Sequence, residues 1–428
     1  MVRIPYVEQF LDIDIPEKNL LFDVGPRDVK SVPEIREEIR RALREPYGAP
    51  QLREMVGPGQ KVVIISDDNT RRTPTRDIVP ILLDELNSAG IPDRDIRILI
   101  SSGTHRPMTG KELDEKYGSA VLNRVPILPH EYKNPEALVD YGTTSRGTRI
   151  MVNRTVIEAD FRMAVGDIIP HHPAGFGGGA KAVLPGVAGE ETVAQLHFLG
   201  SRYPALGRLD SEMRREMEDF AQKIGLNFIV NTVLNREGGL VKVVAGHFIA
   251  AHRQGVEKAK EVYGVQIPEA ADMTLSSTSP VDFDFFQGDK GITSAELATR
   301  KGGEIVLVSG CQEGISPAHP GLADFLGRMS SEQMWERIQL KQTPDPLACA
   351  EAIVINDIRE KMSITIATEG LSPSLCRQLG LLHVLPQQLP DHVKKRLSEN
   401  PELKVGVIRN SAETLPLLPG GAGYHTNP

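Results

Sequence analysis

Short apolar runs alternate with segments of helical periodicity along the chain. Three runs end in polar clusters: residues 61–68 (KVVIISDD), 95–106 (DIRILISSGTHR) and 160–172 (DFRMAVGDIIPHH). Between the first two, residues 75–91 have apolar positions at helical spacing and a glycine near the end, which predicts a crossover helix. This alternation is typical of α/β units arranged around a parallel sheet.

The second half of the chain continues the alternation with four further strands. Between them, residues 291–301 and 345–361 carry the spacing of helices. The sequence therefore predicts an α/β protein with two domains whose largely parallel sheets face a central active-site cleft. We expect an N-terminal domain at residues 1–267, joined by the tail 404–428, and a C-terminal domain at residues 268–403. The four strands are expected at residues 271–278, 303–310, 362–370 and 381–387.

Polar side chains follow the first three strands at the point where each strand ends. In open α/β sheets, ligands bind just beyond the carboxyl ends of the strands. Residues that are far apart in the sequence are therefore expected to share one rim of the sheet. They are Asp67, Asp68, Arg71, His105, His171 and His172.

Composition narrows the classes of function. The 428 residues carry a net charge of −8, which disfavours a nucleic-acid partner because phosphate binding requires a basic face. No apolar stretch approaches the roughly 20 residues that span a bilayer. The first residues lack a signal-peptide core, so we expect a cytoplasmic protein with no membrane partner. The cysteines, Cys311, Cys349 and Cys376, lack paired spacing and are expected to be reduced and mostly buried.

The stretch IIPHHPAGFGGGAKAVLPGVAG, residues 168–189, combines two histidines, a run of glycines and a lysine. Glycine has no Cβ, so Gly177, Gly178 and Gly179 allow backbone N–H groups to approach an anion closely. A phosphate-bearing ligand is one interpretation, although the stretch matches neither a P-loop nor the dinucleotide fingerprint. The alternative is a flexible turn with Lys181 in solvent.

Four of the 11 histidines lie at strand ends or near the glycine-rich stretch: His105, His171, His172 and His197. A single histidine is more often a structural residue than a ligand or a base. Four of them converging on one rim indicate a functional site. A three-histidine zinc site is one interpretation, but the chain has no HxH or HExxH pair here, which disfavours zinc hydrolysis.

Charged groups come from two further segments. Asp68 and Arg71 lie in the loop SDDNTRRTPTRD. An arginine fork can bind a carboxylate, and an aspartate can orient a histidine. In the second half, Gln287 and Lys290 begin a predicted helix. A lysine is electrostatically disfavoured at a helix N-terminus, so Lys290 is a candidate for contact with an anion, and its alternative is an ordinary exposed lysine.

Taken together, four motifs resemble the nickel-dependent lactate racemase family. They occur in the family's order and span both expected domains. The resemblance implies a racemase or epimerase of a 2-hydroxy acid. In one departure, His172 stands where the family usually has an aromatic residue. The motifs are SDDNTR (66–71), GTHRPMT (103–109), PHHPAGFGGGAKAVLPGVAGEETVAQLH (170–197) and QGDK (287–290).

The resemblance also implies a cofactor, the nickel-pincer nucleotide. In this family a lysine at the position of Lys181 is joined through a thioamide to a pyridinium mononucleotide, whose ring carbon and two sulfurs hold nickel. His197 matches the histidine that completes the square of ligands, a geometry that suits nickel(II). The glycines at 177–179 then make room for the nucleotide. Cofactor-synthesis enzymes are the expected transient partners, and a chain made without them is expected to lack the cofactor.

The implied mechanism avoids a carbanion. One histidine takes the hydroxyl proton while hydride passes from Cα to the cofactor, which gives a planar 2-keto acid that can be reduced on either face. His105 and His171 match the family's acid/base pair, and Asp68 is expected to orient His105. The residues expected to hold the substrate are Arg71 and Lys290, on its carboxylate, and Gln287, through a hydrogen bond.

Two other functions remain open on the sequence. A zinc-dependent hydrolase or lyase would use the histidines and carry no adduct on Lys181. A non-catalytic nucleotide-binding or cofactor-carrier protein would carry the adduct and tolerate replacement of His105 and His171. Substrates vary within the family, so the sequence predicts a small 2-hydroxy acid without specifying which one.

Overall fold

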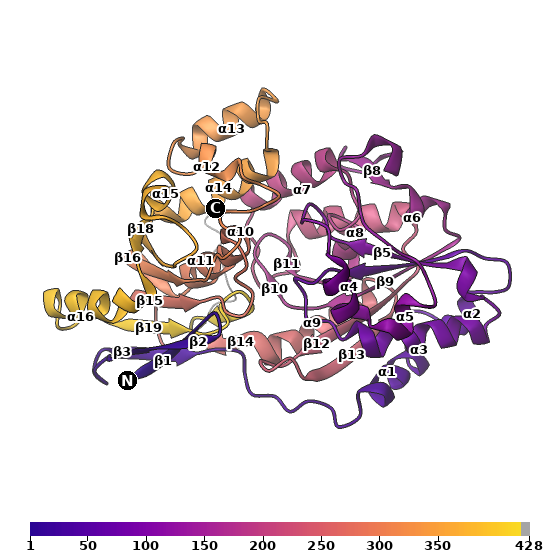
Figure 1. Cartoon of the computed structure of the whole chain (residues 1–428), viewed down its shortest axis with the longest axis horizontal. Helices are drawn as coiled ribbons and strands as arrows, with labels where there is room; N and C mark the ends of the chain where they lie inside the picture. The colour runs from indigo at the N-terminus through magenta and orange to yellow at the C-terminus, as the bar shows by residue number, and fades with distance from the viewer. Residues whose placement is uncertain (421–428) are drawn as a thin grey trace.

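The computed structural model describes residues 1–420, which form two lobes built on two six-stranded sheets (Figure 1). We call the lobe on the sheet that contains β4 the first lobe, at the right of Figure 1. The lobe on the sheet that contains β15 is the second lobe, at the left. The α/β class with large parallel sheets confirms the fold class predicted from the sequence.

The first sheet has the order β13-β12-β9-β4-β5-β6 and is parallel except for the β12–β13 pair. Successive residues of a strand point to opposite faces. In β4, Ile64 therefore packs in one core and Ile65 in the other. The strands are β4 (Val62–Asp67), β5 (Ile96–Ser101), β6 (Ile127–Leu128), β9 (Phe161–Asp167), β12 (Phe228–Leu234) and β13 (Leu240–Gly246).

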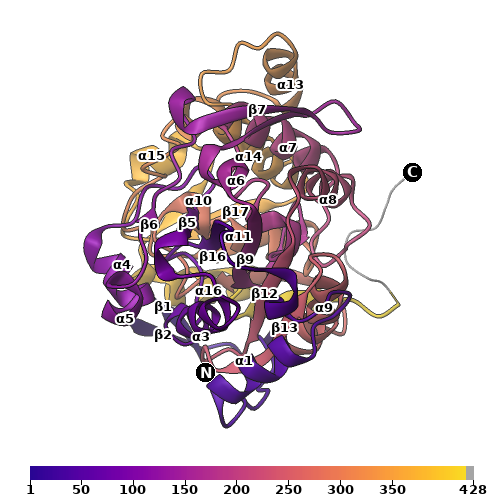
Figure 2. The same cartoon turned by 90° about the vertical axis from the view of Figure 1, so that its right-hand side faces the viewer.

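Helices cover both faces of the first sheet. Figure 2 shows α7 and α8 on one side of β9 and β12, with α1 and α3 on the other. The predicted crossover helix is α3. The helices are α1 (Ile35–Arg44), α2 (Leu52–Met55), α3 (Thr75–Ser88), α4 (Gly110–Tyr117), α5 (Ser119–Leu122), α6 (Arg154–Glu158), α7 (Glu190–Arg202), α8 (Glu212–Ile224) and α9 (Ala250–Tyr263).

The second sheet is parallel throughout, in the order β18-β17-β16-β15-β19-β3. Its first four strands match those predicted for the second half. The edge strand β3 comes from the beginning of the chain and lies beside β19 (Figure 1). The strands are β3 (Leu20–Val24), β15 (Ala271–Ser277), β16 (Thr299–Val308), β17 (Ser363–Ala367), β18 (Leu382–Val384) and β19 (Val405–Ile408).

One core of the second lobe lies under helices that include α11 and α14, and the other lies under α16 and the antiparallel hairpin β1–β2. The hairpin strands are β1 (Val2–Tyr6) and β2 (Gln9–Ile13). The helices are α10 (Phe285–Gly288), α11 (Lys290–Glu296), α12 (Leu322–Phe325), α13 (Ser331–Gln339), α14 (Pro346–Arg359), α15 (Pro373–Gln378) and α16 (Leu389–Glu399).

Three small strand pairs complete the fold. The antiparallel pair β10–β11 forms a short hairpin beside the first sheet, and it opens the glycine-rich stretch. The remaining strands are β7 (Leu138–Thr143) with β8 (Arg149–Asn153), β10 (Pro170–His171) with β11 (Gly175–Phe176), and β14 (Gly264–Gln266) with β20 (Leu415–Leu417).

Sheet membership at the two chain ends differs from the expected domain division. Residues 20–24 were expected in the N-terminal domain, and the tail from 404 was expected to join it. Instead β3 and β19 pair in the second sheet, and only β20 turns back to β14. The domain boundaries themselves remain a prediction, and residues 421–428 of the expected tail lie outside the described residues.

Two further expectations concern the whole chain. Cys311, Cys349 and Cys376 are free and buried, as predicted. Within residues 1–420, no helix combines the length and the apolar character needed to cross a bilayer.

A buried carboxylate joins α16 to the second sheet. Glu304 of β16 is 3% exposed and accepts hydrogen bonds from Thr365 Oγ1 (2.7 Å), His392 Nε2 (2.8 Å) and Arg396 Nε (2.9 Å). Burial raises the pKa of this carboxyl, but its hydrogen bonds to His392 and Thr365 and the nearby charges outweigh burial and lower the pKa below 4.5. The ionised form is therefore favoured by folding.

We predict that Glu304→Gln lowers the free energy of unfolding by roughly 1–3 kcal/mol near neutral pH, because hydrogen bonds to a charge are lost. The wild-type carboxylate stabilises the fold above pH 4.5, its ordinary pKa, and this contribution is lost as the pH falls through the lower pKa of the folded state. Urea unfolding should therefore show the two proteins converging at low pH.

Glu399→Gln is the matched control, because Glu399 also pairs with Arg396 (3.1 Å) but is largely exposed. Its unfolding free energy should change by less than about 0.5 kcal/mol. If Glu304→Gln lowered the free energy of unfolding by the same amount at neutral and acidic pH, the stabilising role of the ionised Glu304 carboxylate would be contradicted.

Candidate active site

One cavity of about 140 Å³ lies at the carboxyl ends of β4, β5 and β9 and is closed on its far side by the second lobe. It brings together every rim residue expected from the sequence. The glycine-rich stretch and α7 supply further walls, and α10, α11 and α14 contribute from the second lobe. The expected site residues that line it are Asp68, Arg71, His105, His171, His172, Gly177, Gly178, Lys181, His197, Gln287 and Lys290.

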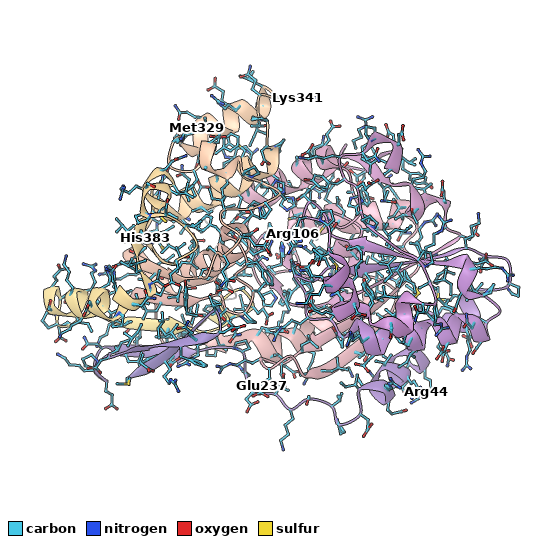
Figure 3. All side chains as sticks on the ribbon, viewed as in Figure 1. Arg44, Arg106, Glu237, Met329, Lys341 and His383 are labelled. Carbon is cyan, nitrogen blue, oxygen red and sulfur yellow. The ribbon has the colours of Figure 1, made fainter. Side chains whose placement is uncertain are left out.

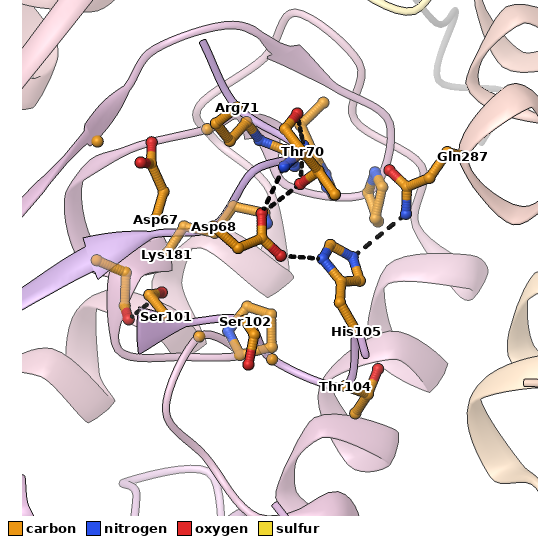
Figure 4. A pocket seen from close by; sticks show the side chains of 18 of the residues that line it. Asp67, Asp68, Thr70, Arg71, Ser101, Ser102, Thr104, His105, Lys181 and Gln287 are labelled. Atoms are coloured by element: carbon orange, nitrogen blue, oxygen red, sulfur yellow. Dashed lines mark hydrogen bonds and ion pairs between the residues drawn. The ribbon is translucent and has the colours of Figure 1, made fainter. Parts of the chain in front are cut away.

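His105 is held between the lobes by two side chains (Figure 4). Its Nδ1 lies 2.6 Å from Asp68 Oδ2, and its Nε2 lies 3.3 Å from the amide nitrogen of Gln287. Burial raises the pKa of Asp68, but the charge of His105, its hydrogen bond and the charge of Arg71 hold that pKa well below its usual range. The carboxylate therefore keeps the proton of neutral His105 on Nδ1, and the Nε2 lone pair accepts from the Gln287 amide at the cavity wall.

Asp68 is itself fixed by the turn that follows β4. Its Oδ1 accepts hydrogen bonds from Thr70 N (3.0 Å) and Thr70 Oγ1 (2.5 Å). The side chain is 3% exposed. This local turn explains why the sequence SDDNT places a carboxylate rigidly at the end of a strand.

The glycine-rich stretch approaches other parts of the first lobe too closely for side chains. Gly178 and Gly179 have φ values of +71° and +59°. A Cβ on Gly178 would lie 2.8 Å from the side chain of Ile168, and one on Gly179 would lie 2.8 Å from the ring of His252. Asn231 of β12 anchors the turn by accepting a hydrogen bond from Gly179 N (2.8 Å). The glycines therefore permit a tight cradle that no other residue type would fit.

Lys181 follows this cradle in a short 3₁₀ helix, Gly179–Ala182, and its amine faces the cavity. Desolvation, together with the charges of Arg71 and Lys290, lowers the pKa of Lys181 to about 7. A substantial fraction of this amine is therefore neutral at neutral pH, whereas an exposed lysine is almost fully protonated. Neutral amines are nucleophiles.

His171 ends β10, on the hairpin that precedes the cradle. Desolvation and the charges of Lys181 and Lys290 lower its pKa well below 6.5. Its Nδ1 is buried and has no hydrogen-bond partner among residues 1–420. His171 is thus a neutral imidazole with unused hydrogen-bonding capacity at the cavity wall.

His197 lies on α7, and its Nδ1 is 2.8 Å from the carbonyl oxygen of Val193. That carbonyl can only accept, so Nδ1 carries the proton and the lone pair is on Nε2. Desolvation lowers the pKa of His197 to about 4, although the hydrogen bond partly offsets this effect. The ring is therefore a neutral imidazole with a fixed tautomer, and its Nε2 lone pair could bind a metal.

Arg71 lies above two carboxylates at the end of the first sheet. Its Nε is 3.8 Å from Asp167 Oδ1, and neighbouring Asp67 is paired with Lys116 at 2.8 Å. Burial and the charge of Asp67 raise the pKa of Asp167 to about 7, although Arg71 opposes the rise. Because Asp167 is partly protonated at neutral pH, part of the guanidinium charge remains available to a ligand.

Gln287 and Lys290 come from the second lobe, at α10 and the first residue of α11. Lys290 Nζ donates a hydrogen bond to Gln287 Oε1, which directs the Gln287 amide nitrogen towards His105. Desolvation and the charge of Arg71 lower the pKa of Lys290 to about 8, although Asp289 opposes the shift. The second lobe thus supplies one cation and one oriented amide to the same cavity.

Some residues of the cavity were not anticipated from the sequence. Asp167 follows the same rule as Asp67, because it is the last residue of a buried strand, and that rule could have found it. Asp289 and Glu351 adjoin one another beside Lys290, and burial raises the pKa of both carboxyls. Glu351 lies on α14, and no sequence pattern distinguishes it from an ordinary helix residue.

His172, which was expected on this rim, also lines the cavity, and desolvation lowers its pKa to about 3.

The described side chains do not form a ready-made metal site. Among residues 1–420, no group of three or more His, Cys, Asp or Glu side chains is arranged to hold an ion. The interpretation of a three-histidine zinc site therefore has no ligand set in the described chain. A metal at this site would therefore take some of its ligands from a bound molecule or from water.

Comparisons with known proteins identify relatives over most of the chain. The lactate racemase N-terminal domain family matches residues 6–206. Lactate racemase of Thermoanaerobacterium thermosaccharolyticum is 32% identical over 321 residues, which cover 73% of this chain and 75% of the relative. Lactate racemase of Lactiplantibacillus plantarum is 35% identical over 285 residues, which cover 65% of this chain and 67% of the relative.

Solved structures agree with these relationships. The lactate racemase apoprotein of T. thermosaccharolyticum matches with a TM-score of 0.86 and 28% identity, over 97% of this chain and 99% of that one. A Thermotoga maritima protein with 23% identity shares the fold, with a TM-score of 0.72 over 91% of this chain and all of that one. The chain therefore belongs to the lactate racemase family and is an isomerase of the racemase type.

Proposed function

We propose that this chain racemises or epimerises a 2-hydroxy acid by oxidising it to a 2-keto acid and reducing it again. One observation carries the proposal: the amine of Lys181 and the imidazoles of His105, His171 and His197 line the same cavity. The relatives are lactate racemases, so lactate is the first substrate to test.

The residues present fit a nickel-pincer nucleotide attached to Lys181. The amine has a lowered pKa, the backbone of Gly177 and Gly178 lines the same cavity, and the His197 tautomer presents Nε2 as a metal ligand. Lys181 would carry the group, Gly177 and Gly178 would border its nucleotide, and His197 would bind nickel. Gly179, also expected there, does not line the cavity and packs against His252. When bound, the group supplies a reversible acceptor for the hydride ion that leaves Cα.

The protons are handled by the chain's own imidazoles. In one direction His105 Nε2 accepts the hydroxyl proton of the substrate, and Asp68 stabilises the imidazolium that forms. Loss of that proton and of hydride from Cα leaves a planar 2-keto acid, which can be reduced on either face. His171 serves as the second acid/base group, because desolvation keeps it neutral and ready to accept a proton.

The substrate carboxylate is held by cations from both lobes. Arg71 offers a guanidinium fork from the first lobe, and Lys290 offers an ammonium group from the second. Gln287 lies between Lys290 and His105, so its amide is placed to hydrogen bond the same substrate. Because the carboxylate needs both lobes, binding favours the closed arrangement, which excludes water from the keto acid.

The proposal is tested by making the chain together with the enzymes that synthesise the cofactor. We expect intact-mass analysis to show an adduct on Lys181, metal analysis to show bound nickel, and chiral chromatography to show loss of optical purity in a 2-hydroxy acid. Lys181→Arg keeps the positive charge but removes the nucleophile, so it should show none of the three. Racemisation by unmodified protein would contradict the proposal.

We predict that Lys181 of the cofactor-free chain reacts with a small acylating reagent with a midpoint near pH 7, following its lowered pKa. Only the neutral amine reacts, so labelling should rise through this pH, whereas exposed lysines rise only near their ordinary pKa of about 10.4. Peptide mass spectrometry measures both in one sample, with exposed Lys111 as the internal control. Equal midpoints for Lys111 and Lys181 would refute the prediction.

We predict that His105→Gln and His171→Gln each lower kcat of the loaded enzyme by roughly 10²–10⁴-fold, the usual effect of losing a general acid or base. His383→Gln serves as the control, because His383 hydrogen bonds to Thr368 O in the second lobe, outside the cavity. Adduct formation should persist in all three variants. A loaded His105→Gln enzyme with wild-type kcat would exclude the assigned role.

A further inference from the structure

Three consecutive residues of the loop after β5 contact the second lobe. Thr104 Oγ1 lies 2.8 Å from His319 Nε2, and His105 Nε2 lies 3.3 Å from Gln287. Arg106, labelled between the lobes in Figure 3, donates to both carboxylate oxygens of Glu313 at 3.2 and 3.1 Å. The loop that carries His105 is therefore attached to the opposite lobe on both sides of this residue.

The contact through Thr104 is the buried one. Thr104 is 4% exposed and His319 is 2% exposed. In contrast, the side chains of Arg106 and Glu313 are 35% and 34% exposed. Exposed ion pairs contribute little because water screens the charges, whereas a buried hydrogen bond is costly to lose. Of these two contacts with the second lobe, the Thr104–His319 bond is therefore the more costly to lose.

His319 is fixed in turn by its own lobe. Its Nδ1 lies 3.0 Å from Asp345 Oδ1, and its ring stacks on Phe286 with centroids 5.1 Å apart. Asp345 caps the N-terminus of α14 by accepting a hydrogen bond from Ala348 N. The carboxylate keeps the His319 proton on Nδ1, so Nε2 accepts from the Thr104 hydroxyl. A rigid helix end thus determines the position of the acceptor.

We propose that His319 is a positioning residue: by accepting the Thr104 hydroxyl hydrogen bond, it fixes the loop that carries His105 when the lobes are closed. His319 does not line the main cavity and touches no reacting atom. It acts through Thr104, the residue next to His105. The inference rests on the acid/base role proposed for His105.

Thr104→Val removes the hydroxyl at nearly constant volume and leaves His319 Nε2 buried without a donor. We expect the loaded enzyme to lose roughly 10- to 100-fold in kcat, the size of effect that a misplaced catalytic group produces. KM should stay within about twofold, because the carboxylate contacts of Arg71 and Lys290 remain. Thr104→Ser keeps the hydroxyl and should restore most of kcat.

Thr299→Val is the matched control. Thr299 is 5% exposed, and its Oγ1 hydrogen bonds to Thr274 Oγ1 at 2.7 Å, in the second lobe and outside the cavity. Thr299→Val loses a buried threonine hydroxyl of the same kind, but away from the His105 loop. Its kcat should therefore equal that of the wild type. The double variant Thr104→Val/His319→Leu should have a kcat no lower than that of the slower of the two single variants, Thr104→Val and His319→Leu. Both substitutions remove the same contact, so their effects should not add.

Hydrogen exchange of the cofactor-free chain tests the positioning independently of catalysis. Peptides covering residues 102–106 should exchange roughly tenfold faster in Thr104→Val than in Thr299→Val, because a local opening becomes easier. Equal exchange rates in the two variants would overturn the inference. So would faster exchange in Thr104→Val together with a wild-type kcat. If instead His105→Gln retained full kcat, the proposed acid/base role would fail, whatever the exchange rates show.

Discussion

The cavity depends on the close approach of three cationic side chains in a poorly solvated space. Arg71, Lys181 and Lys290 come from a strand end, a glycine turn and a helix start. Burial and the charge of Arg71 lower the pKa of both lysines, and Lys290 lowers the pKa of Lys181 further. Like charges at short range in a low-dielectric setting repel strongly. The pKa of each lysine is lowered as a result. The carboxylates of Asp68 and Asp167 offset part of the positive charge that remains in the cavity.

The surroundings of the imidazoles in this cavity differ in solvation and in nearby charge. Burial lowers the pKa of both His171 and His197, and the charge of Lys181 lowers both further, so the two rings stay neutral. His105 differs, since Asp68 offers a counter-ion to the protonated ring at 2.6 Å. One site can therefore contain the imidazole proposed as a metal ligand and the two proposed acid/base groups in unlike surroundings. Neither lobe alone could produce this balance, because Lys290 and Gln287 come from the second lobe.

Local patterns predicted the parts of the site that depend on local structure. Asp68 and His105 follow buried parallel strands, so the sheet itself brings them to one rim. The contacts between lobes could not be predicted in this way: Thr104 and His319 are 215 positions apart. Likewise β3 has an ordinary apolar pattern, which does not say that its partner is β19. The family resemblance linked Gln287 and Lys290 to the first lobe, and strand patterns alone would not have done so.

The placement of β3 has a consequence for how the chain is made. This strand spans residues 20–24, whereas its neighbour in the sheet, β19, spans residues 405–408 and is therefore synthesised much later. The first lobe can fold while synthesis continues, as domains generally do. Until then the backbone of β3 has no β19 to pair with, and the lobe that supplies Lys290 is completed only after residues 405–408 have been synthesised.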